Sequence, residues 1–464
     1  MTTGSLQPVR NKNRARRDKQ IANETTPLLP SKHEGSSEFH EFNGASFSGA
    51  VFNLSTTIIG AGIMALPATM KVLGLVPGIV MIIFIAFLTE ASVEMLIRFS
   101  RVEKMTSYGG VMGDAFGRIG RMLLQICVVI NNVGIMVVYM IIIGDVLSGT
   151  SSTSIPHSGL LEEWFGRHLW NGRFLVLTIT TLLVFVPLAS FKRIDSLRYT
   201  SALSVALAAV FVVVTAAIAI VKLVSGSVQM PRLFPEITDL SSVWNLFTAV
   251  PVLVTAFICH YNVHSVDNEL DDSSLIQPIV RTSLALCSTV YIATSFFSYL
   301  LFGDSTLDDV LTNFDSDLGI PYSSLLNDIV RVSYVLHLML VFPIIFFALR
   351  LNFDGLLFPS ARPISSDNRR FAFVTLLLLS FVFLAANFIP SIWDAFQFTG
   401  STATVCIGFI FPAAITLRDA HAIASNRDKI LSSFMIVLAV VSSGVAIYSD
   451  VFAIFQRSKP APKY

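Results

Sequence analysis

The stretch from Val51 to Pro67 reads VFNLSTTIIGAGIMALP, an apolar run with two glycines, Gly60 and Gly62, at its centre. Each glycine costs about 1 kcal/mol relative to alanine in a helix interior. If a membrane helix breaks at this point, the N–H groups at the start of its second half present a positive dipole end. Such an end suits a carboxylate at the membrane midplane. The alternative is that both glycines only let a neighbouring helix approach closely.

Working outward from this stretch, the whole chain has the composition of a membrane protein. Of its 464 residues, 53% are hydrophobic and 14% are charged, whereas about a quarter are charged in soluble domains. A helix needs about 20 apolar residues to cross a bilayer. Apolar segments of this kind lie near residues 46–70, 74–98, 120–148, 174–191, 199–222, 243–268, 280–302, 328–350, 371–389, 393–417 and 431–456. We therefore expect an all-α polytopic membrane protein of about eleven transmembrane helices, with residues 44–456 as its transmembrane domain.

Lysine and arginine residues indicate the orientation, since positively charged connectors stay in the cytoplasm. The first 43 residues contain seven of them, the connector after the fourth predicted helix adds Lys192, Arg193 and Arg198, and residues 303–327 contain none. We expect residues 1–43 to form a disordered cytosolic tail. Because the predicted helices are odd in number, residues 457–464 should form a short extracytoplasmic tail.

The sixth predicted helix is the second unusual span. It reads TAVPVLVTAFICHYNVHSVDNEL from Thr248 to Leu270 and contains Pro251, His260 and His264. The two histidines are four residues apart and share one helix face, but a metal site needs further ligands, which do not lie nearby. No set of nucleophile, base and orienting residue emerges either. An enzyme, a metal site and a bound cofactor are therefore not expected.

Three motifs carry a resemblance to a known family. They are Gly60-Ala61-Gly62 before Pro67, Phe257-Ile258-Cys259-His260 with Glu269-Leu270 behind it, and Phe302-Gly303-Asp304 after the seventh predicted helix. With these motifs the chain resembles, from residue 44 to about residue 455, the system A and system N neutral amino acid transporters. These belong to the amino acid/auxin permease superfamily, and the plant and fungal vacuolar amino acid transporters are their relatives.

That resemblance implies a fold of the leucine-transporter type, in which helices 1–5 and 6–10 form an inverted repeat and an eleventh helix is added. Two broken candidates that lie five helices apart agree with it. The resemblance also implies secondary active transport of an amino acid held between broken helices 1 and 6. The candidate substrate-binding residues are Ser55, Thr56, Thr57, Gly60, Ala61, Gly62, Thr255, Phe257 and Cys259. An amino acid sensor built on a transporter scaffold is the alternative.

The expected coupling ion follows from a departure from that family. Sodium-coupled members hold the ion partly with an Asn side chain at the position of Thr56 and a Thr side chain at the position of Val341. A valine offers no oxygen for a hard cation. His337 lies one turn before Val341 and can change its charge between about pH 5 and 8. We expect proton coupling, with sodium coupling as the alternative, and the candidate ion-coupling residues are His337, then His260 and Glu269. The other reading of His337 is a neutral histidine that is hydrogen-bonded within the bundle.

The N-terminal tail also contains a candidate sorting motif. Glu24 lies four residues before the pair Leu28 and Leu29, which is the pattern that clathrin adaptors read for delivery to endosomal, lysosomal or vacuolar membranes. A vacuolar, lysosomal or other endomembrane location is therefore favoured, with the plasma membrane as the alternative. The expected partners are an amino acid, the coupling ion, the lipid bilayer and clathrin adaptors, and no nucleic acid.

Overall fold

The computed structural model describes five stretches of the chain, residues 44–150, 157–228, 230–315, 317–388 and 400–457. All of them lie in one unit of the chain, Phe42–Tyr464. The motif of Glu24, Leu28 and Leu29 lies outside the described residues, as do the rest of residues 1–43 and residues 458–464. What the sequence indicates for the two tails therefore stays a prediction.

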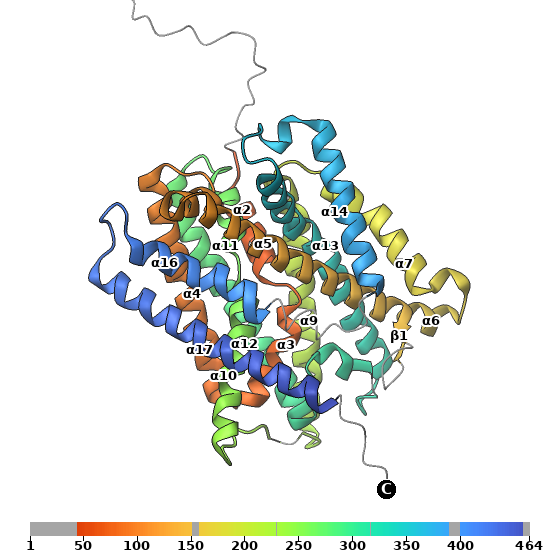
Figure 1. The fold of residues 1–464 in the computed structure, drawn as a ribbon. Coiled ribbons are helices and arrows are strands. Elements are labelled where there is room, and N and C mark those ends of the chain that lie inside the picture. The colour runs from red at the N-terminus through yellow and green to blue at the C-terminus, as the bar shows by residue number, and fades with distance from the viewer. Residues whose placement is uncertain (1–43, 151–156, 229, 316, 389–399, 458–464) are drawn as a thin grey trace, which may run out of the picture. The chain divides into compact units, whose positions relative to one another are not determined.

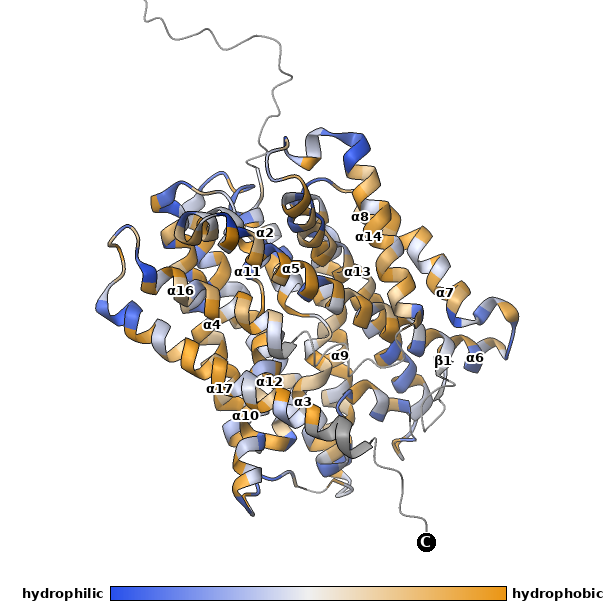
Figure 2. Ribbon diagram, in the orientation of Figure 1, coloured by the Kyte–Doolittle hydropathy of each residue, from blue (hydrophilic) through white to orange (hydrophobic). Residues whose placement is uncertain are grey.

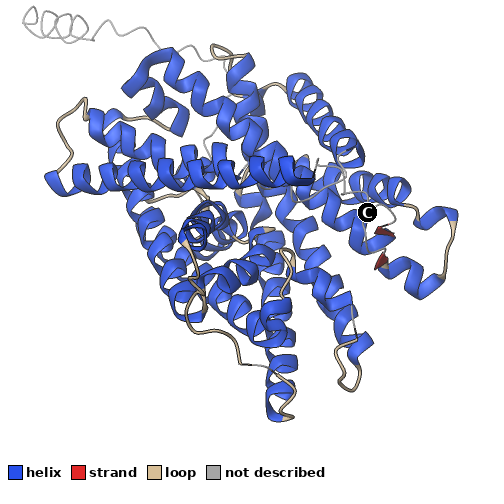
Figure 3. Cartoon of the chain, turned by 60° about the horizontal axis from the view of Figure 1, so that its bottom comes forward, coloured by secondary structure: helices blue, strands red, loops and turns tan. Residues whose placement is uncertain are grey.

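Helices make up nearly all of the described chain (Figure 1, Figure 3), which confirms the all-α prediction. The longer helices are α4 (Leu75–Glu103), α5 (Tyr108–Ser148), α9 (Arg198–Val224), α10 (Leu240–Phe257), α12 (Ile276–Phe302), α13 (Ser323–Leu357), α14 (Asn368–Phe388) and α17 (Asn426–Arg457). The shorter helices are α2 (Phe47–Ile58), α3 (Gly62–Leu73), α6 (Leu160–Phe165), α7 (Arg173–Thr180), α8 (Val186–Ala189), α11 (His260–Asp267) and α16 (Phe411–Arg418).

Single helical turns and one strand pair complete the described elements. The 3-10 turns are η1 (Leu169–Asn171), η3 (Asp195–Leu197), η4 (Ser273–Leu275), η5 (Gly303–Ser305), η6 (Val310–Asp315) and η7 (Ile364–Ser366). The π-helical turns are η2 (Thr181–Phe185), η8 (Gly400–Thr404) and η9 (Cys406–Ile410). The strands β1 (Gly149–Thr150) and β2 (His157–Ser158) pair antiparallel.

The described helices match the positions of the predicted spans. In the described part of the chain, eight segments are long and apolar enough to cross a membrane, and the bent pair α2 and α3 makes a ninth if it is counted as one span. Within the described residues, two shorter apolar helices, Arg173–Ala189 and Thr402–Arg418, overlap the fourth and tenth predicted spans. The protein is therefore a multi-pass membrane protein, while the count of eleven helices stays a prediction.

Apolar side chains point outward along these helices, as lipid requires. Figure 2 shows hydrophobic residues along the middle of the helices and hydrophilic residues gathered at their connections. On α17, Val437 and Val440 are 61% and 57% exposed. Such surfaces face hydrocarbon in a membrane protein, so their exposure needs no partner protein.

The two interrupted helices lie in the interior of this unit. Helices α2 and α3 pack against α9, α10 and α12, and α13 packs against α5 and α9. The third predicted span begins earlier than expected, since α5 starts at Tyr108 and is kinked at Gly117, which has φ 67°. That backbone conformation favours glycine. The packing brings the two breaks and the middle of α5 to one place.

Candidate functional site

The first helix breaks where its glycines predict. Helix α2 ends at Ile58 and α3 begins at Gly62, with 58° between the two parts. Ile59 has an extended backbone, φ −75° and ψ 105°. The first N–H groups of a helix have no partner within that helix, so the amides from Gly60 to Gly62 form the positive end of α3. The last carbonyls of α2 form a negative end facing the same gap.

The second break lies between α10 and α11. Ile258 is extended, with φ −67° and ψ 121°, and Cys259 also leaves the helical region. Thr255 donates a hydrogen bond of 2.8 Å from its hydroxyl to the carbonyl of Pro251, so this predicted substrate residue is engaged within its own helix. Phe257 and Cys259 are fully buried at the break.

The two breaks touch each other. A Cβ atom added to Gly62 would lie 3.0 Å from Cα of Ala256, so the start of α3 lies directly against the end of α10. Tyr291 of α12 places its hydroxyl 2.7 Å from the carbonyl oxygens of both Ile58 and Ala256. A hydroxyl has one hydrogen, so the two carbonyls share it. One tyrosine thus joins the ends of α2 and α10.

A second tyrosine occupies the positive end of α3. A Cβ atom on Gly60 would lie only 1.9 Å from the phenol oxygen of Tyr139, so no larger residue fits there while Tyr139 keeps this position. The backbone N–H of Ala61 donates a hydrogen bond to the same oxygen. Tyr139, from the second half of α5, is 2% exposed. Its oxygen therefore lies where a carboxylate oxygen of a ligand would accept the same hydrogen bond.

The hydroxyls before the first break point to different neighbours. Thr56 donates to the carbonyl of Ser201 on α9 at 3.0 Å, and Thr57 accepts a hydrogen bond of 3.1 Å from Asn262 on α11. The hydroxyl of Ser55 has no hydrogen-bond partner among the described residues. All nine predicted substrate residues are buried, so the breaks are closed off from the surface in this conformation.

His337 lies beside the first break. It is fully buried, and its Nδ1 lies 2.8 Å from the carbonyl oxygen and 2.9 Å from the hydroxyl of Ser204 on α9. The carbonyl of Ile59 interacts with the same imidazole. Val341, one turn further along α13, is fully buried as well and has no side-chain oxygen. The imidazole thus links α13, α9 and the end of α2.

The other two candidate coupling residues lie elsewhere. His260 begins α11, and its Nε2 lies 3.0 Å from the hydroxyl of Ser92 on α4. Glu269 accepts hydrogen bonds from the backbone N–H groups of Ile194 at 3.0 Å and Asp195 at 2.7 Å. Burial raises the pKa of Glu269 above its usual range, although these two hydrogen bonds oppose the shift. Glu269 thus anchors the start of the α9 segment and does not contact either break.

Four residues at this site were missed by the sequence analysis: Tyr139, Tyr291, Ser204 and Asn262. Asn262 ties the second break to α2 and to α13, because its side-chain N–H₂ group donates to Thr57 and to the carbonyl of Ile344. A signal for the tyrosines was present, since tyrosine favours the ends of membrane spans and both lie in the middle of one. A buried tyrosine hydroxyl usually has a hydrogen-bond partner.

The sequence matches a family model over most of its length. The model for transmembrane amino acid transporter proteins matches residues 43–455. The chain is 65% identical to the amino acid transporter AVT6A of Arabidopsis thaliana, over 98% of this chain and 99% of that protein. It is 62% identical to AVT6B of the same plant, over 94% and 96%, and 48% identical to AVT6C, over 92% and 98%.

Solved structures share the fold at low sequence identity. A manganese transporter of Eremococcus coleocola has a TM-score of 0.52 and 16% identity, covering 89% of this chain and 88% of that one. A Na⁺-coupled sialic acid symporter in a substrate-bound outward-open state has a TM-score of 0.55 and 12% identity, covering 87% and 90%. The fold is of the leucine-transporter type, as the resemblance implied.

Proposed function

The chain belongs to the family of transmembrane amino acid transporter proteins, and from this premise we propose that it is a secondary active transporter that moves an amino acid together with a proton. The resemblance to the amino acid/auxin permease superfamily is confirmed, and the chain is not an enzyme. The observation that carries the proposal is the direct contact between the two helix breaks, with Gly62 against Ala256.

The substrate's backbone charges match the two kinds of helix end at the breaks. The carboxylate would displace the phenol oxygen of Tyr139 from the N–H of Ala61, at the positive end of α3. The phenol could then donate its own hydrogen bond to the carboxylate. The ammonium group would lie against the carbonyls of Ile58 and Ala256, which Tyr291 now holds. Helix ends favour opposite charges in this way.

Proton coupling is supported by the surroundings of His337. A protonated His337 would place a positive charge beside the carbonyl of Ile59, at the negative end of α2. The affinity for a substrate bound at the same break would then depend on the charge of His337. The sodium alternative lacks a side-chain oxygen at Val341. A sodium ion needs several oxygen ligands, as other hard cations do.

The location we propose is an acidic endomembrane compartment of the vacuolar type, with the N-terminus in the cytosol. The leucine pair Leu28 and Leu29, which follows Glu24, supports this location. The proposed proton coupling agrees with this location, because an acidic lumen supplies the gradient for export of amino acids to the cytosol. Exchange of both leucines for alanine should move a tagged protein to another membrane.

Uptake into proteoliposomes tests the proposed function. The purified protein is offered a panel of amino acids, with sodium replaced by choline and a pH gradient imposed or omitted. We expect sodium-independent uptake that rises with the proton gradient, and we expect His337→Ala to lose that response. A collapse of uptake in choline would mean that sodium drives transport. Substrate binding without uptake in any gradient would favour the sensor.

A further inference from the structure

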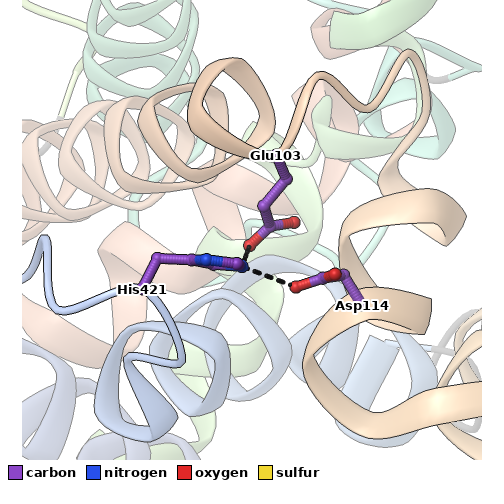
Figure 4. A group of neighbouring side chains, drawn as sticks. All are labelled: Glu103, Asp114 and His421. Carbon is purple, nitrogen blue, oxygen red and sulfur yellow. Dashed lines mark hydrogen bonds and ion pairs between the residues drawn. The ribbon is translucent and has the colours of Figure 1, made fainter.

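Three side chains that can bind a metal ion meet away from the helix breaks. Glu103 ends α4, Asp114 lies in the first part of α5, and His421 lies in the connection between α16 and α17. Figure 4 shows the Glu103 carboxylate pointing into the space between the other two. Nε2 of His421 lies 2.8 Å from Asp114 Oδ2 and 3.6 Å from Glu103 Oε1. One ligand atom from each residue lies within 4.8 Å of the others.

Glu103 is the unusual member of this cluster. Its side chain is only 2% exposed, and its Oε2 has no hydrogen-bond partner among the described residues. A buried carboxylate is costly unless it is paired, and the group beside it, Asp114, is another carboxylate. The 3.6 Å from Glu103 to His421 is too long for a good hydrogen bond. The cluster is therefore short of positive charge on the Glu103 side.

Neighbouring basic side chains are engaged elsewhere. The guanidinium of Arg418 lies over the ring of Phe116, 5.2 Å from its centre, and Lys429 forms an ion pair of 2.9 Å with Asp419. Asp419 also accepts backbone hydrogen bonds from residues 423 and 424, at 2.8 and 3.0 Å. These bonds hold the connection that carries His421 in a fixed shape.

We propose that Glu103, Asp114 and His421 form a site for a divalent cation of the zinc class. Zn²⁺ takes imidazole nitrogen and carboxylate oxygen ligands at about 2.0–2.2 Å, so neighbouring ligands of a tetrahedral ion are about 3.4 Å apart. The separations in the cluster range around this value, and two carboxylates balance the charge of the ion. A water molecule can supply the fourth ligand. The bound ion would tie α4, α5 and the α16–α17 connection together, on the side that the charge pattern predicts to be cytosolic.

Metal titration of the full-length protein in detergent tests this site. Zn²⁺ affinity is measured by competition with a chromophoric chelator after the protein has been stripped with EDTA. We expect one equivalent of Zn²⁺ per chain, and affinity lowered about tenfold or more by each of Glu103→Gln, Asp114→Asn and His421→Ala, as ligand changes produce. His168→Ala is the matched control. His168 is exposed, as His421 is, but its imidazole stacks on the ring of Trp170 and belongs to no cluster of metal ligands among the described residues.

The outcomes separate a metal site from an ion pair. Because His421 lies in an exposed connection, His421→Ala should elute and unfold like the parent protein in EDTA. This variant therefore still tests the site if Glu103→Gln fails to fold. Metal should raise the melting temperature of the parent and of His168→Ala, and not that of His421→Ala. Equal Zn²⁺ affinity in the parent and in His421→Ala would overturn the proposal. No stoichiometric binding by the parent would overturn it as well.

Discussion

Tyr139 fills the space beside the first break in this structure. Its phenol oxygen accepts the Ala61 N–H and fills the space that a side chain at Gly60 would take. In the binding mode we propose, a substrate carboxylate has to compete with one oxygen atom for one amide. The breaks are closed while Tyr139 holds this position, so the proposed binding requires this side chain to move.

Replacing Tyr139 with phenylalanine keeps the ring and removes the hydroxyl. We expect the KM for amino acid uptake to rise at least tenfold, because the displaced phenol can no longer donate its hydrogen bond to the substrate carboxylate. A hydrogen bond to a charged group contributes about 1.5–3 kcal/mol. Uptake is measured in proteoliposomes with equal amounts of inserted protein. Tyr299→Phe is the control, since Tyr299 is equally buried on α12 and does not contact the breaks. An unchanged KM in Tyr139→Phe would show that the phenol hydroxyl does not bind the substrate.

Asp309 offers a test of pH dependence outside the membrane spans. Burial raises its pKa from 3.8 to about 6, with Asp315 and Asp308 adding to the shift. Between these two values the folded state binds more protons than the unfolded state, so stability falls as pH rises through this window and is level above it. The full effect is about 3 kcal/mol.

Asp309→Asn mimics the protonated form at every pH. We expect it to melt at the same temperature as the parent near pH 4 and at a higher temperature than the parent above pH 6. Melting curves of both proteins from pH 4 to pH 8 measure this difference. A difference that does not change with pH would show that Asp309 titrates normally.

At the level of single residues, the sequence could predict a helix break at the two glycines, but it could not identify the residues that contact them. Gly60 and Gly62 stand out because glycine is costly in a helix interior. Their neighbours Tyr139 and Ala256 lie on helices distant in the sequence, and so does Tyr291, whose hydroxyl reaches a carbonyl 233 residues away. Such pairs depend on how the helices pack. Close approach at Gly62 is also present, so the packing alternative describes part of its role.

At the level of elements, apolar windows located most helices and misjudged those with polar or irregular parts. Helix α5 starts at Tyr108, whereas the predicted span starts near residue 120. The prediction missed the first turns because Asp114, Arg118 and Arg121 interrupt the hydrophobic pattern there. The described parts of the fourth and tenth spans contain π-helical turns, which hydropathy does not reveal. The break in the first helix was predictable because its glycines lie in the centre of an otherwise continuous apolar run.

Bulk at the start of α3 should stop transport. Even a Cβ atom at Gly62 would lie 3.0 Å from the backbone of Ala256, so Gly62→Leu must push α3 away from α10 and cover the amides. We expect uptake to be abolished while the protein still inserts, as measured by uptake per inserted molecule. Gly444→Leu on α17 is the control, because nothing lies within 4 Å of a Cβ atom there. Normal uptake by Gly62→Leu would contradict a substrate site at this break.

For the whole molecule, an odd number of spans predicts that the two ends of the chain lie on opposite sides of the membrane. A tag before Met1 should be protected from protease in sealed vesicles that have the cytosolic side inward, and a tag after Tyr464 should be cleaved. Both tags on one side would rule out eleven spans. The described helices lie at the positions of the predicted spans, and the count of eleven stays a prediction.

Proton movement is the most direct test of whether an amino acid crosses between the two breaks together with a proton. Proteoliposomes in sodium-free buffer carry a pH-sensitive dye inside, and a transported amino acid is added outside without any imposed gradient. We predict acidification inside that depends on the amino acid and is absent in Gly62→Leu and in His337→Ala. Amino acid entry without acidification, or entry only when sodium is present, would contradict proton-coupled transport at the two breaks.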